Sequence, residues 1–178
     1  MTPPLLAITG KKNSGKTTLT VKLAAVLTAR GVRVNTIKHG SHTFNMDPEG
    51  TDTFRHYHEG LADRVAMISP DKFALVMRRP EGDDLTPQLI VERYMSDADL
   101  VLCEGFKATD LPKIEIYRRA AHQLPLYEES LPNQLSWRAM VSDTEAEWMP
   151  FPVFLMSKDG WLDELADWVQ AKFLAARS

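Results

Sequence analysis

Residues 10–17 read Gly-Lys-Lys-Asn-Ser-Gly-Lys-Thr, which is the spacing of a phosphate-binding P-loop. The two glycines allow backbone N–H groups to point inward at a β-phosphate, and the N-terminus of a following helix adds partial positive charge. In this motif Lys16 reaches the β- and γ-phosphates and Thr17 binds Mg²⁺. The sequence therefore predicts a nucleoside triphosphate site. Its predicted contact residues are Gly10, Lys12, Asn13, Ser14, Gly15, Lys16, Thr17 and Thr18.

A second chemical feature is Glu104, which follows the apolar run Leu-Val-Leu-Cys at residues 100–103 and precedes Gly105. Parallel sheets present their ligand sites at the carboxyl ends of strands. We therefore predict that Glu104 holds Mg²⁺ together with Thr17 and takes part in catalysis with Lys16. Asp99 competes for this role, but it precedes the strand and also suits capping or surface charge.

Strand-like and helix-like segments alternate along the chain, so we predict an α/β, P-loop NTPase-like fold with helices on both faces of a mainly parallel sheet. A Pro70-Asp71 turn between two closely spaced strands predicts an antiparallel hairpin inside that sheet. One domain is expected to span the whole chain. The strands are predicted at about 5–9, 32–37, 65–69, 73–77, 100–103, 113–117, 138–141 and 153–156. The helices are predicted at about 16–30, 51–60, 86–95 and 160–176, the last with its aromatic residues in the core.

Bulk composition narrows the class of protein. The chain has 178 residues and a net charge of -3, so we expect no nucleic acid and no membrane among its partners. Cys103 is the single cysteine and lies in an apolar run, where a small buried thiol is expected. No segment approaches the roughly 18 apolar residues of a membrane span, and the first residues lack a signal-peptide pattern. We therefore expect a cytoplasmic protein.

Taken together, the motifs resemble the molybdopterin-guanine dinucleotide biosynthesis adapter family, MobB, over most of residues 4–173. The resemblance rests on residues 12–19, 37–39 with His42, the set Asp47, Gly50, Asp52 and Arg55, and residues 99–107. It implies a homodimeric GTP-binding protein with weak GTPase activity. Such a protein assists the guanylyltransferase that joins GMP to molybdopterin and works with other cofactor-biosynthesis proteins. Lys11 departs from the family pattern and resembles the signature lysine of dimeric P-loop ATPases, although a solvated lysine beside polyphosphate is the simpler interpretation.

The polar loop that begins at Lys38 suggests a switch-like surface beside the γ-phosphate. Asp47 or Asp52 would hold Mg²⁺ or position the attacking water, and Arg55 would contact phosphate. The alternative is a solvated loop, with Asp52 placed in the first turn of a helix. A zinc site built from the histidines of this region and Cys103 is disfavoured by their spacing.

Recognition of guanine is assigned to Asp143, because residues 141–143 resemble the stretch where the family carries an aspartate. Asp159 is the second choice, since residues 157–159 form a degraded Asn-Lys-x-Asp motif. Capping of the last helix is the alternative role for Asp159.

Two other functions stay open. A P-loop small-molecule kinase would use the same loop with lid arginines, for which Arg78, Arg79, Arg118 and Arg119 are the candidates. A non-catalytic interaction module would bind nucleotide tightly without turnover.

Overall fold

The computed structural model describes residues 2–40, 47–79, 82 and 84–175. The chain divides into two compact units: unit 1 is formed by residues 1–39 and 86–178, and unit 2 by residues 40–85. Each unit is described by itself below. That the whole chain works as one nucleotide-binding domain stays a prediction.

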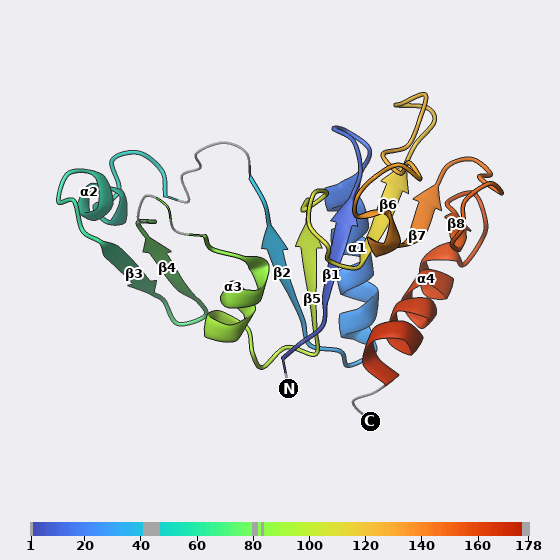
Figure 1. Cartoon of the computed structure of the whole chain (residues 1–178). Coiled ribbons are helices and arrows are strands. Elements are labelled where there is room, and N and C mark those ends of the chain that lie inside the picture. Colours follow the sequence, from blue (N-terminus) through green and yellow to red (C-terminus); the bar gives the residue numbers. More distant parts are fainter. Residues whose placement is uncertain (1, 41–46, 80–81, 83, 176–178) are drawn as a thin grey trace. The chain divides into compact units, whose positions relative to one another are not determined.

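Unit 1 is built on a six-stranded sheet with the order β2-β5-β1-β6-β7-β8, in which every neighbouring pair is parallel (Figure 1). This confirms the predicted α/β fold class with its mainly parallel sheet. The strands are β1 (Leu5–Thr9), β2 (Val34–Lys38), β5 (Leu100–Glu104), β6 (Lys113–Tyr117), β7 (Trp137–Ser142) and β8 (Val153–Leu155).

Helices cover both faces of this sheet, as predicted. On one face, α1 (Lys16–Ala29) and α4 (Trp161–Val169) bury Leu23 and Leu165 against strand residues such as Ile8 and Leu102. On the other face, α3 (Pro87–Tyr94) buries Val91 near Val101 and Cys103. The aromatic residues of the last helix pack against the first core, as expected. That helix was predicted to run to residue 176, but α4 ends at Val169 and continues as a π-helical turn, η2 (Gln170–Leu174).

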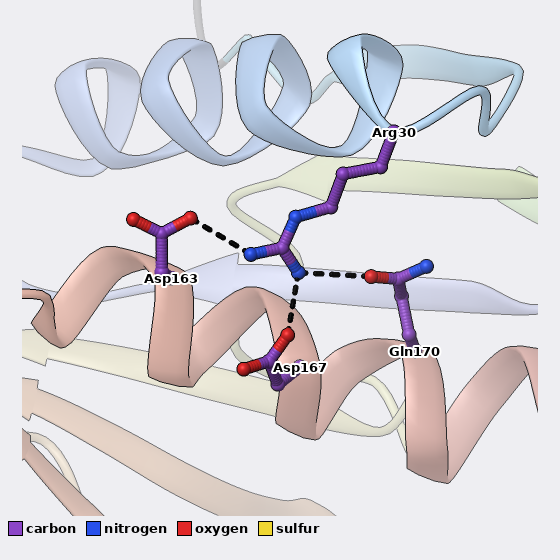
Figure 2. Close-up of polar contacts among 4 residues, drawn as sticks. All are labelled: Arg30, Asp163, Asp167 and Gln170. Atoms are coloured by element: carbon purple, nitrogen blue, oxygen red, sulfur yellow. Dashed lines mark hydrogen bonds and ion pairs between the residues drawn. The ribbon is translucent and has the colours of Figure 1, made fainter.

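Arg30, the residue that follows α1, ties this helix to α4. Its guanidinium donates to Asp163 Oδ1 and Asp167 Oδ1, both at 2.7 Å, and to Gln170 Oε1 at 2.9 Å (Figure 2). These three acceptors lie on successive turns of one helix face, because they are spaced by four and three residues. The contact ties the C-terminal end of α1 to α4. The N-terminal end of α1 continues from the P-loop.

Unit 2 contains α2 (Asp52–His58) and a hairpin of β3 (Arg64–Ile68) and β4 (Phe73–Met77). The antiparallel pairing was predicted, but its placement inside the parallel sheet was wrong, because the hairpin forms a separate two-stranded sheet. Arg78 connects the hairpin to α2. It donates to the carbonyls of Ala62 and Tyr57, and its guanidinium carbon lies 4.3 Å from the centre of the Tyr57 ring.

One face of β6 carries three buried polar side chains. Glu115 accepts hydrogen bonds from the backbone N–H groups of Leu126 and Tyr127 and from the indole N–H of Trp137. Lys113 donates to the Thr109 carbonyl, and Tyr117 donates to the Gln123 carbonyl at 2.9 Å. Buried backbone N–H and C=O groups need hydrogen-bond partners, and these side chains supply them to the segments beside β6. Irregular segments, rather than a helix, can therefore cover this part of the sheet.

The buried Glu115 gives a pH-dependent prediction. Burial raises the pKa of this carboxyl above 4.5, and its hydrogen bonds and Lys11 only partly oppose the shift. The folded state therefore binds the proton more tightly than the unfolded state, so the free energy of unfolding should fall as pH rises from 4.5 to the raised pKa. Urea unfolding across this range should show that this decrease is lost in Glu115→Gln. The control Glu147→Gln, at an exposed position, should keep it, and equal slopes in parent and Glu115→Gln would contradict the assignment.

Candidate functional site

The phosphate-binding loop joins the carboxyl end of β1 to the start of α1 and lies close to β6. Gly10 has φ 152°, and a Cβ atom placed there would lie 2.5 Å from Ser14 Oγ and 2.6 Å from the Ile116 carbonyl oxygen. Only glycine fits this approach. Gly15, with φ 100°, is the N-cap of α1, so the helix N–H groups begin directly behind the loop.

Two polar groups inside the loop fit a phosphate ligand. Lys16 Nζ donates to the carbonyls of Gly10 at 3.1 Å and Lys11 at 2.8 Å, which holds the ammonium across the loop. Ser14 Oγ is buried and has no hydrogen-bond partner among the described residues. An unpartnered buried hydroxyl is costly in an apolar surrounding, and a phosphate oxygen would accept its hydrogen bond. The predicted contact residues Gly10 and 12–18 thus lie on one continuous loop and the first helical turn.

Glu104 lies where the sequence predicted, at the carboxyl end of β5. Thr17 Oγ1 donates to Glu104 Oε1 at 2.8 Å, and Lys38 Nζ lies 3.2 Å from the same oxygen. A hydroxyl and a carboxylate side by side are suitable ligands for Mg²⁺. Asp99 is at the opposite end of β5, where its carboxylate accepts the backbone N–H of Arg33 at 2.8 Å. The geometry therefore favours Glu104.

Charge at this site is mostly positive. Burial lowers the pKa of Lys16; Glu104 opposes this shift, while Lys38 and Lys107 reinforce it. A cluster of cations within electrostatic reach of the P-loop favours a ligand with several negative charges. An open cavity of about 370 Å³ adjoins Thr17, Lys38 and Glu104 and is otherwise lined by Thr20, Val21, Ala24, Thr36 and Ile37.

The other predicted metal and catalytic residues belong to unit 2. Asp47 precedes α2, and Asp52 is in its first turn, behind the N-cap Thr51. Arg55 pairs with Glu59 on the same helix, with 3.1 Å between Nε and Oε2. His42 lies outside the described residues. The roles of Asp47, Asp52 and Arg55 at the nucleotide stay predictions.

Asp143 follows β7 and has backbone partners. Its carboxylate accepts the N–H groups of Arg119 at 2.7 Å and Ala120 at 3.3 Å, so it holds the segment after β6. Reading of guanine by Asp143 stays a prediction. Asp159 does not cap the last helix, as the alternative interpretation had it, because the N-cap of α4 is Gly160.

Sequence reasoning missed three features of the site. The contact between Lys38 and Glu104 follows from strand register, which the sequence does not show. His122 Nε2 lies 2.6 Å from the Lys12 carbonyl and joins the segment after β6 to the P-loop. The buried partners of Glu115 support the same segment, and the only available signal was a charged residue inside an apolar strand pattern.

A family model described as molybdopterin guanine dinucleotide synthesis protein B, MobB, matches residues 5–143. This chain belongs to the MobB family. The match covers the P-loop, Glu104 and Asp143, and confirms the family predicted from the motifs. It supports the adapter interpretation rather than the small-molecule kinase alternative.

Similar proteins agree with this membership. The chain is 32% identical over 168 residues to the molybdopterin-guanine dinucleotide biosynthesis adapter protein of Escherichia coli strain K12, covering 94% of each chain. It resembles a crystal structure of molybdopterin-guanine biosynthesis protein B with a TM-score of 0.68 and 26% identity, covering 94% of this chain and 97% of the other. A MobB homologue from Bacillus stearothermophilus gives a TM-score of 0.63 at 27% identity, with 95% and 97% covered.

The close approach of Gly10 to its neighbours gives a prediction for this MobB-family chain. Gly10→Ala places a methyl group 2.6 Å from the Ile116 carbonyl oxygen, so the loop must move away from β6. We expect at least about tenfold weaker nucleotide binding, measured by calorimetric titration, since phosphate contacts need well-placed donors. Gly31→Ala is the matched control, because Gly31 also has positive φ but nothing within 4 Å of the added Cβ. Equal nucleotide affinity of both variants would refute the role of the Gly10 contact.

Proposed function

We propose that this MobB-family chain binds GTP with Mg²⁺ and serves as an adapter in molybdopterin-guanine dinucleotide biosynthesis. The observation that carries the proposal is the convergence of Lys16, Thr17 and Glu104 behind a loop that tolerates no side chain at Gly10. Backbone N–H groups and Lys16 would bind the phosphates, and Ser14 Oγ would gain an acceptor.

Mg²⁺ would be held by Thr17 and Glu104, and when bound it would neutralise charge between the β- and γ-phosphates. We propose that GTP hydrolysis by this chain is weak. In unit 1 the side chain of Glu104 is nearly buried and accepts from Thr17 and Lys38, which suits a metal ligand better than a base for water. Asp52 and Asp47 are the proposed groups for positioning water or holding the metal through water.

The adapter role rests on the family. Relatives carry the name molybdopterin-guanine dinucleotide biosynthesis adapter protein, including the one of Escherichia coli strain K12. By the same resemblance we propose that the partners are the guanylyltransferase and other proteins of this biosynthesis, that the chain forms a homodimer, and that it works in the cytoplasm.

No helix within the described ranges combines the length and apolar character needed to cross a membrane.

The nucleotide site is tested first by Lys16→Ala. Lys16 is the cation that the loop itself holds, and charged hydrogen bonds contribute about 1.5–3 kcal/mol each, so GTP affinity should fall roughly 10- to 100-fold. Calorimetric titration with GTP measures this loss. Lys22→Ala, at an exposed position of α1, is the control and should bind as the parent does. Full affinity in a folded Lys16→Ala variant would refute the P-loop assignment.

Base recognition is tested by Asp143→Asn. A carboxylate that accepts from the guanine ring N–H and amino group becomes an amide that can donate to the extra carbonyl of xanthine, so XTP should replace GTP as the preferred ligand. Competition binding with GTP, XTP and ATP measures the preference. If Asp143 only anchors Arg119 and Ala120, GTP and XTP should weaken equally. A change of preference in Asp159→Asn alone would instead assign the role to Asp159.

A further inference from the structure

Lys38 and Thr17 contact the same oxygen of Glu104, Oε1, at 3.2 Å and 2.8 Å. We propose that Lys38 is an internal counter-cation for Glu104 that competes with Mg²⁺, and so sets the Mg²⁺ concentration at which this chain binds nucleotide. The inference rests on the proposed function, since it assigns a regulator to the metal position of that site.

Strand register places Lys38 beside Glu104. In the pairing of β2 with β5, Lys38 is the partner of Glu104, and in the pairing of β1 with β5 the partner of Glu104 is Ile8. Partners in neighbouring strands lie about 4.8 Å apart and direct their side chains to the same face. The backbone N–H of His39 donates to the Glu104 carbonyl at 3.0 Å, which holds the register to the end of β2. The ion pair is therefore built into the sheet.

The two partners differ in exposure, and this decides which one can move. The Glu104 side chain is 11% exposed, whereas the Lys38 side chain is 66% exposed. An ammonium at the surface can leave a carboxylate and be hydrated by water at a small cost in free energy. A carboxylate at the end of a buried strand keeps its position. The open cavity lined by Lys38, Thr36 and Ile37 gives the lysine stem room to turn away.

Electrostatics requires that displacement. Mg²⁺ on Glu104 Oε1 would place two positive charges beside an ammonium about 3 Å from that oxygen, and like charges at such distances repel strongly. Mg²⁺ must therefore replace Lys38 at Glu104. The free energy of Mg²⁺ binding is then less favourable by the free energy of the ion pair that is broken.

The experiment is a titration with Mg²⁺ of the complete chain and a fluorescent, non-hydrolysable GTP analogue. Lys38→Met removes the charge but keeps an unbranched side chain. Exposed ion pairs contribute up to about 1 kcal/mol, so the Mg²⁺ concentration for half-maximal binding should fall about two- to fivefold. Lys38→Arg, which keeps the charge, should remain within about twofold of the parent, and Lys22→Met on α1 should not change. Analogue affinity without Mg²⁺, measured in EDTA, should fall much less in Lys38→Met than in Lys16→Ala, because Lys38 acts on the polyanion only through its charge.

Two outcomes would overturn the inference. An unchanged or higher Mg²⁺ requirement in a folded Lys38→Met variant would show that the ion pair does not compete with the metal. A loss of analogue affinity in EDTA as large as that of Lys16→Ala would show that Lys38 binds phosphate instead. If Lys38→Met fails to fold, Lys38→Gln provides the same test, because it also removes the charge and keeps an unbranched side chain. A parent that binds no nucleotide at any Mg²⁺ concentration would instead refute the proposed function.

Discussion

The hydrogen bond between Thr17 and Glu104 joins residues that are 87 positions apart in the chain and connects the first turn of α1 to the end of β5. It is possible only because β5 lies between β1 and β2 in the sheet. The loop after β1 and the carboxylate of the last residue of β5 then meet where the carboxyl ends of the strands lie together, as they do in a parallel sheet. At its other end α1 is joined to α4 through Arg30, so each end of the helix has a side-chain contact with another element of unit 1.

A second constraint is the way irregular chain covers the β6 side of the sheet. Glu115 binds two backbone N–H groups of the segment after β6, and Asp143 binds two more nearer its start. The same segment brings His122 to the Lys12 carbonyl. Carboxylates thus position a loop beside the P-loop without a helix. Lys113 is fully buried in this polar layer, and desolvation lowers its pKa to about 8.

The features that the sequence predicted are those with local signals. The P-loop is recognisable from glycine and lysine spacing, and Thr86 with Pro87 marks the start of α3 because both act within one turn. Glu104 was predictable because a strand delivers its last residue to the sheet edge. The hairpin was assigned to the wrong sheet, since a short turn between strands defines their pairing but not which sheet they join. The Lys38 contact and the burial of Glu115 depend on register and packing, which no local pattern encodes.

The proposed site would reconcile a negative protein with a polyanionic ligand by holding Lys16 and Lys38 on internal acceptors. The chain carries a net charge of -3, yet the charges of Lys38 and Lys107 both act on Lys16 at the loop. Lys16 donates to loop carbonyls and Lys38 to Glu104, so each has a partner before a phosphate arrives. Cations that already contact an acceptor repel one another less, which stabilises the loop. Ligand binding would then have to replace each of these internal contacts by a contact with the ligand. Under the proposed function, nucleotide and metal affinity would therefore be differences between two sets of charge-assisted contacts, and in the internal set the Lys38–Glu104 pair is fixed by sheet register.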